Sequence, residues 1–314
     1  MPHGENTAPG ALSARRGTRC RTGPRPPAAT RRGVPLVVAC ALLWLAVGMG
    51  SCNSLFFQPN RIGYAFPPQF GLGYEEVYFR SGDGTQLTAW FLPARGTPRG
   101  TIIHFHGNGA NISNHLVLVH WLPAQGYSVF TFDYRGYGVS EGEATRAGLI
   151  ADGVAAIEYI RGRADVDPQR LIVFGQSLGG AVAISALART GTEGVRALVV
   201  EGSFASYREV ARLIMNNFWL TWPLQYPAAY LLFSDDLRPL DDLPRVADVP
   251  LLVIHSEVDR TVPFANGESL FAAFPGEDKT FWRVPRLPHG ATFARDGSPW
   301  RARLLRYLEE KLIP

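Results

Sequence analysis

The sequence contains little cysteine, which limits the crosslinks that it can form. Its three cysteines are Cys20, Cys40 and Cys52, so none follows residue 52. The long carboxyl-terminal part therefore has no disulfide and should fold in either redox compartment. Its roughly 260 residues show no internal repeat and suit one large α/β domain, which we place at 53–314 after an amino-terminal segment at 1–52.

A basic surface is also missing from that part. The net charge is +4, but residues 1–33 hold seven arginines and one glutamate, a charge of +6, which leaves −2 for residues 34–314. Nucleic-acid binding normally needs a basic face, so we expect no nucleic-acid partner. No His/Cys cluster occurs at metal-ligand spacing and no glycine loop of the phosphate-binding kind is present, so we expect neither a metal nor an organic cofactor.

Apolar runs alternate with helix-compatible stretches along the chain. Two strands joined by a turn at 81–84 indicate an antiparallel hairpin, and the continuous apolar strands that follow predict a mostly parallel sheet with helices on both faces, an α/β fold. The expected strands are 75–79, 85–92, 101–106, 128–133, 171–174, 195–201, 251–255 and 280–284, and the expected helices are 113–124, 145–163, 178–189, 265–274 and 299–311.

The sequence Gly175-Gln176-Ser177-Leu178-Gly179-Gly180 stands between an expected strand and an expected helix. Glycines flank the serine at a spacing of two, as a strained turn requires where a Cβ would collide with the crossing backbone. Such a turn exposes the Ser177 hydroxyl at the edge of the sheet. We predict Ser177 to be a nucleophile.

A serine nucleophile needs a base and an orienting carboxylate. His289 follows the expected strand 280–284 across a loop, whereas His255 ends a buried strand, so we predict His289 to be the base. Past His255 come Glu257 and Asp259. Asp259 is our prediction for the carboxylate and Glu257 is the alternative, since both follow Ser177 and precede His289, the order typical of this turn.

Acyl transfer also needs hydrogen-bond donors for an oxyanion. The strand 101–106 ends in Gly107-Asn108-Gly109, a loop of small residues. We predict the backbone amides of Asn108 and Leu178 as the donors. His106 precedes the nucleophile by a whole strand and helix, so we expect it to support the loop by hydrogen bonding rather than to catalyse.

These motifs together resemble the α/β-hydrolase superfamily in order and spacing over about residues 60–314. Within it, the chain looks like the branch of membrane-associated α/β-hydrolase-domain proteins, which includes protein depalmitoylases. Two departures are visible, because Ser256 stands where relatives usually carry glycine and Leu287-Pro288 precede the histidine where small residues are common. The segments that carry the resemblance are His106-Gly107-Asn108, residues 133–142, residues 175–180, residues 255–259 and Pro288-His289.

The segment 203–248 is rich in large rings and is expected to form a small helical lid. Since this connection crosses above the predicted nucleophile, we expect some of its rings to line a hydrophobic acyl-binding pocket. The rings are Phe204, Phe218, Trp219, Trp222, Tyr226, Tyr230 and Phe233.

The amino-terminal segment resembles an export signal. An Arg-rich stretch precedes an uncharged apolar run at 34–50, and Met49-Gly50-Ser51-Cys52 resembles a bacterial lipobox with Met in place of the usual Leu. We predict that lipid on Cys52 tethers the protein to a membrane of the bacterial cell envelope. The alternative is an uncleaved signal anchor.

The sequence therefore predicts a membrane-tethered serine hydrolase of carboxylic esters or acyl thioesters. One alternative is a serine peptidase of the prolyl-oligopeptidase type, although the large gating domain of that type is missing. The other is a non-catalytic binding lipoprotein on the same fold. The natural substrate and the oligomeric state stay open.

Overall fold

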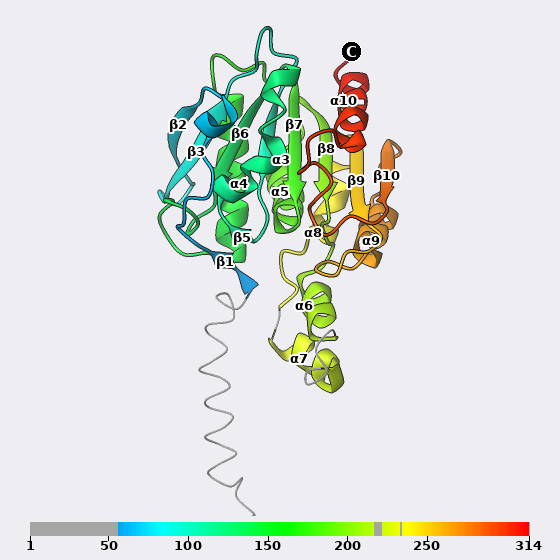
Figure 1. Ribbon diagram of the computed structural model, residues 1–314. Helices are drawn as coiled ribbons and strands as arrows, with labels where there is room; N and C mark the ends of the chain where they lie inside the picture. The colour runs from blue at the N-terminus through cyan, green and yellow to red at the C-terminus, as the bar shows by residue number, and fades with distance from the viewer. Residues whose placement is uncertain (1–55, 217–221, 233, 314) are drawn as a thin grey trace, which may run out of the picture. The chain divides into compact units, whose positions relative to one another are not determined.

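The computed structural model describes residues 56–216, 222–232 and 234–313 (Figure 1). An eight-stranded sheet in the order β10-β9-β8-β7-β4-β6-β3-β2 forms its centre. Strand β3 is antiparallel to both of its neighbours, and all other pairs are parallel, which confirms the predicted mixed α/β sheet with its opening hairpin. The strands are β2 Glu75–Arg80, β3 Gln86–Leu92, β4 Gly100–Phe105, β6 Tyr127–Asp133, β7 Leu171–Gln176, β8 Val195–Glu201, β9 Leu251–Ser256 and β10 Lys279–Val284.

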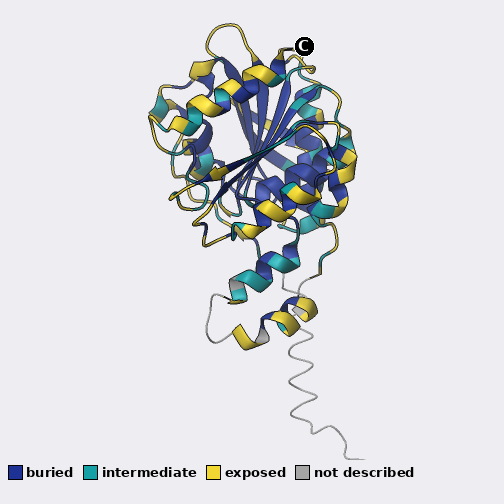
Figure 2. Ribbon diagram, turned by 90° about the vertical axis from the view of Figure 1, so that its right-hand side faces the viewer, coloured by how far each residue is buried: buried dark blue, intermediate teal, exposed yellow. Residues whose placement is uncertain are grey.

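Helices cover both faces of this sheet, and each face has its own hydrophobic cluster. The central strands are buried along their whole length, as continuous apolar runs require, and the helices turn their exposed sides outward (Figure 2). Helices α4 Arg146–Arg161, α5 Leu178–Thr190 and α9 Ala265–Ala273 contribute to one cluster, and α3 Ile112–Val119 and α10 Pro299–Leu312 to the other.

Helix α3 is shorter than the predicted range 113–124. Asn111 caps its start, because the Asn111 Oδ1 accepts the Ser113 N–H at 3.0 Å. The helix ends at Val119, and a separate 3₁₀ turn, η2 Pro123–Gln125, follows. Pro123 has no amide hydrogen and cannot continue the helical hydrogen bonding. The apolar pattern of the sequence continues past Val119, but the helix does not.

One strand pair was not predicted. The short β1 Gln58–Pro59 pairs in parallel with β5 Gly109–Ala110, and the Gln58 N–H donates to the Asn108 side chain at 3.0 Å. The beginning of the described chain thus lies against the loop that follows β4. This contact brings Phe56 to the edge of the candidate site.

The segment between β8 and β9 forms the helical insertion expected at 203–248. Helix α6 packs on α7 there, apart from the sheet (Figure 1). Its elements are α6 Tyr207–Asn216, η3 Trp222–Leu224, α7 Gln225–Leu232, α8 Pro239–Asp242 and η4 Leu243–Val246. The predictions made for the tail, the apolar run 34–50 and Cys52 fall outside the described residues.

Candidate active site

Ser177 occupies a sharp turn between β7 and α5. Its backbone has φ 52° and ψ −120°, which L-residues rarely adopt. Its N–H donates to the Glu201 carbonyl at the end of β8 at 2.8 Å, which anchors the turn to the neighbouring strand. Strain held in this way is typical of functional sites, because the surrounding structure must enforce it.

The glycines around Ser177 are required by close backbone contacts. A Cβ on Gly175 would lie 2.5 Å from the Gly180 Cα, and one on Gly179 would lie 2.0 Å from the Phe105 carbonyl oxygen. A Cβ on Gly107 would lie 3.6 Å from the Ser177 Cβ, so the loop after β4 runs beside the serine. The backbones of strand and helix therefore approach as closely as predicted, and a Cβ at either glycine would collide.

His289 and Asp259 meet across two loops at the carboxyl ends of β9 and β10. The His289 Nδ1 lies 2.6 Å from the Asp259 Oδ2. The other Asp259 oxygen accepts the N–H groups of Thr261 at 2.8 Å and Val262 at 2.9 Å, so the buried carboxylate has a fixed orientation. Glu257, the alternative acid, is instead exposed near Arg283.

His289 and Ser177 line the same cavity. With Nδ1 bonded to the carboxylate, Nε2 is the imidazole nitrogen left to act as a base. Within the described residues, no hydrogen bond joins His289 to Ser177. In ligand-free sites such bonds often form fully only when substrate binds.

The Asn108 loop supplies a free amide beside the serine. The Asn108 side chain is engaged elsewhere, since its Oδ1 accepts the Tyr137 hydroxyl at 2.8 Å and its Nδ2 donates to the Phe56 carbonyl. Within the described residues, neither the Asn108 nor the Leu178 backbone N–H donates to a backbone carbonyl. Both residues line the cavity, so two unused donors lie next to the candidate nucleophile.

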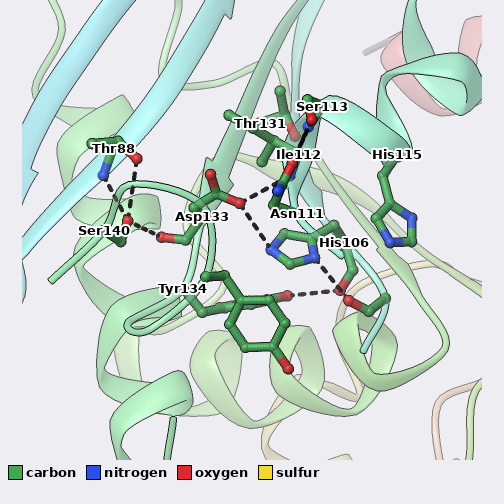
Figure 3. Close-up of polar contacts among 12 residues, drawn as sticks. Thr88, His106, Asn111, Ile112, Ser113, His115, Thr131, Asp133, Tyr134 and Ser140 are labelled. Atoms are coloured by element: carbon green, nitrogen blue, oxygen red, sulfur yellow. Dashed lines mark hydrogen bonds and ion pairs between the residues drawn. The ribbon is translucent and has the colours of Figure 1, made fainter. Parts of the chain in front are cut away.

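His106 is fully buried behind this loop (Figure 3). Its Nδ1 lies 2.8 Å from the Gly107 carbonyl and its Nε2 lies 3.6 Å from an Asp133 oxygen. The Tyr134 hydroxyl donates to the His106 carbonyl at 3.2 Å. Burial lowers the pKa of His106 well below its usual value, so the ring is neutral and supports the loop.

Burial also raises the pKa of the Asp133 carboxyl, to about 7. This carboxyl accepts the Ile112 N–H at 2.9 Å, where α3 begins (Figure 3). Asp133 thus connects the end of β6 to α3 and approaches His106 from the side opposite the cavity loop.

Sequence reasoning missed a buried polar network next to the nucleophile. The Gln176 Nε2 donates to the Glu201 carboxylate at 3.2 Å and to the Gly290 carbonyl at 3.1 Å. Glu201 also accepts the Thr292 N–H at 3.1 Å, and the Gln176 Oε1 lies 3.1 Å from the His115 Nδ1. The network thereby joins the serine turn to the histidine loop.

Glu201 had a signal in the sequence that went unused. It is a charged residue at the end of an apolar run, and such a residue is buried only with specific partners. Burial is the main cause that raises the Glu201 pKa, and the Thr292 and Gln176 hydrogen bonds oppose it. The G-x-S-x-G pattern allows any residue at the position of Gln176. Its role is therefore visible only from its contacts in the structure.

The cavity measures about 720 Å³, and α6 contributes Val210, Ala211 and Met215 to its lining. Of the rings predicted to line it, the structure brings only Phe204 there. Three others, Trp222, Tyr226 and Tyr230, are exposed to solvent, so the prediction that some of these rings line the cavity holds for Phe204 among the described rings. Phe218, Trp219 and Phe233 lie outside the described residues.

The lining carries no formal charge from Asp, Glu, Lys or Arg among the residues that the structure describes. No group of three or more His, Cys, Asp or Glu side chains that could hold a metal ion occurs within the same ranges.

This fold, together with a serine in a glycine turn and a histidine paired with a carboxylate, defines the class of α/β hydrolases. The chain belongs to the α/β-hydrolase superfamily: it is 32% identical over 287 residues to the α/β-hydrolase domain-containing protein WAV2 of Arabidopsis thaliana, covering 88% of this chain and 90% of that one. It is also 36% identical over 245 residues to the uncharacterized protein YfhR of Escherichia coli K12, covering 76% of this chain and 82% of that one.

The serine aminopeptidase S33 family of hydrolases matches residues 96–235. Among solved structures, an esterase of Pyrococcus furiosus superposes with a TM-score of 0.67 at 21% identity, over 81% of this chain and 98% of that one. That likeness concerns the fold. The family assignment identifies the chain as a hydrolase.

Proposed function

We propose that this hydrolase cleaves carboxylic esters or acyl thioesters through a Ser177–His289–Asp259 triad. The observation that supports it best is the 2.6 Å contact between the His289 Nδ1 and the Asp259 Oδ2 beside a cavity that Ser177 also lines. This contact makes the other imidazole nitrogen the proton acceptor. No other histidine that lines the cavity contacts a carboxylate directly within the described residues.

Acylation begins when the His289 Nε2 removes the proton from the Ser177 hydroxyl. The Ser177 Oγ bonds to the acyl carbon, and the carbonyl electron pair moves to the oxygen, where the Asn108 and Leu178 amides bind it. Asp259 stabilises the imidazolium that has formed. The carbonyl then re-forms as the bond from the acyl carbon to the alcohol oxygen or thiol sulfur breaks, the imidazolium donates its proton to that leaving group, and an acyl-Ser177 ester remains.

Deacylation repeats these steps with water. His289 accepts a proton from the water as its oxygen attacks the acyl carbon, and the second tetrahedral intermediate uses the same two amides. Its collapse breaks the bond to the Ser177 Oγ, which recovers its proton from the imidazolium. The products are a carboxylic acid and the free enzyme.

The uncharged cavity supports a hydrophobic acyl group. Val210, Ala211, Met215 and Phe204 provide apolar contacts near Ser177. A purified enzyme should therefore prefer longer acyl esters to acetyl esters. Equal rates for both would contradict the acyl-pocket assignment and leave the triad untouched.

The matching family's name makes aminopeptidase activity the second candidate. An aminopeptidase must bind a substrate ammonium group, which is costly to bury without a carboxylate partner. Because the described lining contains no Asp or Glu, an ester or thioester substrate fits better. A panel of esters, acyl thioesters and peptides distinguishes the two, and cleavage of the peptides alone would favour the aminopeptidase.

We also propose that the amino-terminal segment tethers the hydrolase to a membrane of the cell envelope. The apolar run 34–50 and Cys52 support this from the sequence alone. Within the described ranges, no helix is long and apolar enough to cross a bilayer. Labelling with a fatty-acid analogue should disappear in Cys52→Ala. If the label persists, Cys52 is not the lipidated residue, and if the wild type never labels, the uncleaved anchor is favoured.

A fluorophosphonate probe tests the triad directly. The wild type should label, whereas Ser177→Ala and His289→Ala should not. Labelling that survives Ser177→Ala would refute the assignment of the nucleophile. Phenotypic complementation by Ser177→Ala would instead support the binding-lipoprotein alternative.

A further inference from the structure

One face of η3 and α7 is apolar although it lies open to solvent. Residues 222, 226 and 230 recur every fourth position, as do residues 223, 227 and 231, so both rows lie on one side of the helix. We call these six residues the α7 face: Trp222, Pro223, Tyr226, Pro227, Tyr230 and Leu231. Trp222, Tyr226, Tyr230 and Leu231 are exposed by 58%, 59%, 63% and 76%.

This arrangement is the reverse of an ordinary surface helix. Gln225 and Ala229 are buried on the other side of α7, while the side that meets water has no charged residue. A solvent-facing helix side is normally polar, and an exposed apolar patch marks a contact surface. The α7 face is therefore a contact surface for a partner that accommodates apolar and aromatic side chains.

Arginines of α6 border the α7 face. The Arg208 guanidinium lies 4.6 Å from the centre of the Tyr230 ring, and that of Arg212 lies 5.1 Å from the centre of the Tyr226 ring. Tryptophan and tyrosine are enriched where proteins meet lipid headgroups, and interfacial helices place arginine and lysine beside such an apolar face. The composition of the surface therefore fits the interface of a bilayer.

The chain between the predicted anchor and the lid is short. The Phe56 ring lies 5.6 Å from the Tyr207 ring of α6, and Phe56 also lines the cavity. Cys52 precedes Phe56 by four residues, which span at most about 14 Å when fully extended. An anchor at Cys52, or in the run 34–50 just before it, would hold the α6 region close to the membrane.

We propose that the α7 face rests in the headgroup region of a phospholipid bilayer, so that the cavity receives acyl chains of membrane-embedded substrates. The proposal rests on the tether and the ester hydrolysis argued above. A second copy of the chain is the other partner that an apolar face could take, and the experiments below distinguish the two.

The first experiment measures docking without activity. The full chain is reconstituted in phosphatidylcholine vesicles that contain bromine-labelled lipid, which quenches nearby tryptophans. Wild type should lose more fluorescence than Trp222→Phe, and the difference reports on Trp222. The quenching that remains in Trp222→Phe includes Trp44 of the predicted anchor. Equal quenching of the two proteins would overturn the proposal.

The second experiment compares two substrates in the full chain. Leu231→Glu should slow hydrolysis of a long-chain ester embedded in vesicles by about fivefold or more, since a charge is costly in the interface. Hydrolysis of a soluble short-chain ester should stay within about twofold. Ile313→Glu, at a similarly exposed aliphatic position (68%) that follows α10, should change neither rate.

Three results would count against docking, two from this comparison and one from the size of the chain in detergent. Equal loss on both substrates would show that Leu231→Glu acts on folding or catalysis and not on contact with the bilayer. Unchanged vesicle hydrolysis in Leu231→Glu would refute the lipid contact, and so would a dimer in detergent that Leu231→Glu converts to a monomer, because the face would then bind a second copy. A wild type inactive on both substrates contradicts the proposed hydrolase, while Trp222 quenching still decides docking.

Discussion

At the scale of single residues, the site depends on which hydrogen bonds each side chain can make. Asp259 divides its two oxygens between His289 and the backbone amides of Thr261 and Val262. The carboxylate is thus held before any substrate binds. This preorganisation selects the imidazole tautomer in which the nitrogen facing away from Asp259 is free of hydrogen.

Asp259→Asn should remove this selection and keep the fold. The amide oxygen can still accept the Thr261 and Val262 N–H groups, while the new NH₂ group faces the His289 Nδ1. The imidazole then carries its hydrogen on Nε2 and cannot accept the Ser177 proton, so kcat should fall by about 10⁴. Steady-state hydrolysis of a short ester measures this loss. Glu257→Gln is the control and should stay within about twofold; the reverse result would make Glu257 the acid.

Glu201 should act as a positioning residue. In Glu201→Gln, the new NH₂ group must face either the Gln176 amide or the Thr292 N–H, both of which are donors. The serine turn and the histidine loop should therefore shift apart, and kcat should fall by roughly 10- to 100-fold with KM for a short ester unchanged.

The control for Glu201 is Glu268→Gln, an exposed carboxylate that pairs with Arg283. It should leave both kinetic constants unchanged, and circular dichroism should report the same fold for both variants. A rise in KM without a fall in kcat would show that Glu201 serves substrate binding instead of positioning.

At the scale of elements, the turn from β7 to α5 has no room for a side chain at Gly175 or Gly179. The helix crosses so close to β4 that a Cβ on Gly179 would lie 2.0 Å from the Phe105 carbonyl oxygen. The motif is therefore a packing requirement, independently of the catalytic role proposed for it. Its conformational strain is maintained by neighbouring strands.

Gly179→Ala should consequently destabilise the protein by about 3 kcal/mol or more, because the backbone it meets cannot move aside. Gly162→Ala at the end of α4 is the matched control, since the nearest atom to its Cβ would be at 3.5 Å. Thermal unfolding of both variants measures the difference. Equal midpoints would show that α5 can shift away from β4.

The sequence predicted the main elements because buried parallel strands leave a strong apolar signal. Where it was wrong, a local or tertiary effect prevailed. Helix α3 stops at Val119 before Pro123, although the apolar pattern continues. The sequence also left open which rings of the lid line the cavity, and the structure shows that those at 222, 226 and 230 face outward because Gln225 and Ala229 take the buried side of α7. A run of large rings in the sequence does not reveal which side of the helix packs against the rest of the protein.

At the scale of the whole molecule, stability should depend on pH through the buried Asp133. Its pKa is about 7 in the folded state against 3.8 for the free side chain. The raised pKa means that protonated Asp133 favours the folded state. Its contribution to the free energy of unfolding is complete below about pH 4 and is lost as the pH rises through about 7, where the buried carboxyl ionises.

Asp133→Asn tests this dependence. The melting temperature of the wild type relative to the variant should be lower at pH 8 than at pH 5, because the ionised Asp133 is buried beside a neutral His106. Asp296→Asn, whose side chain is 88% exposed, serves as control and should differ from wild type equally at both pH values. A wild-type advantage that grows with pH would show that Asp133 is ionised and paired.

The sequence by itself determined the glycine turn around Ser177, the chain order of serine, acid and histidine, and the alternation of strands and helices, because these depend on neighbouring residues and on periodic burial. Only the tertiary structure decided that Asp259 and not Glu257 contacts His289, that Gln176 and Glu201 join the serine turn to the histidine loop, and that the α7 face is exposed. Those outcomes depend on the strand register and on the packing of distant segments, so no local pattern records them.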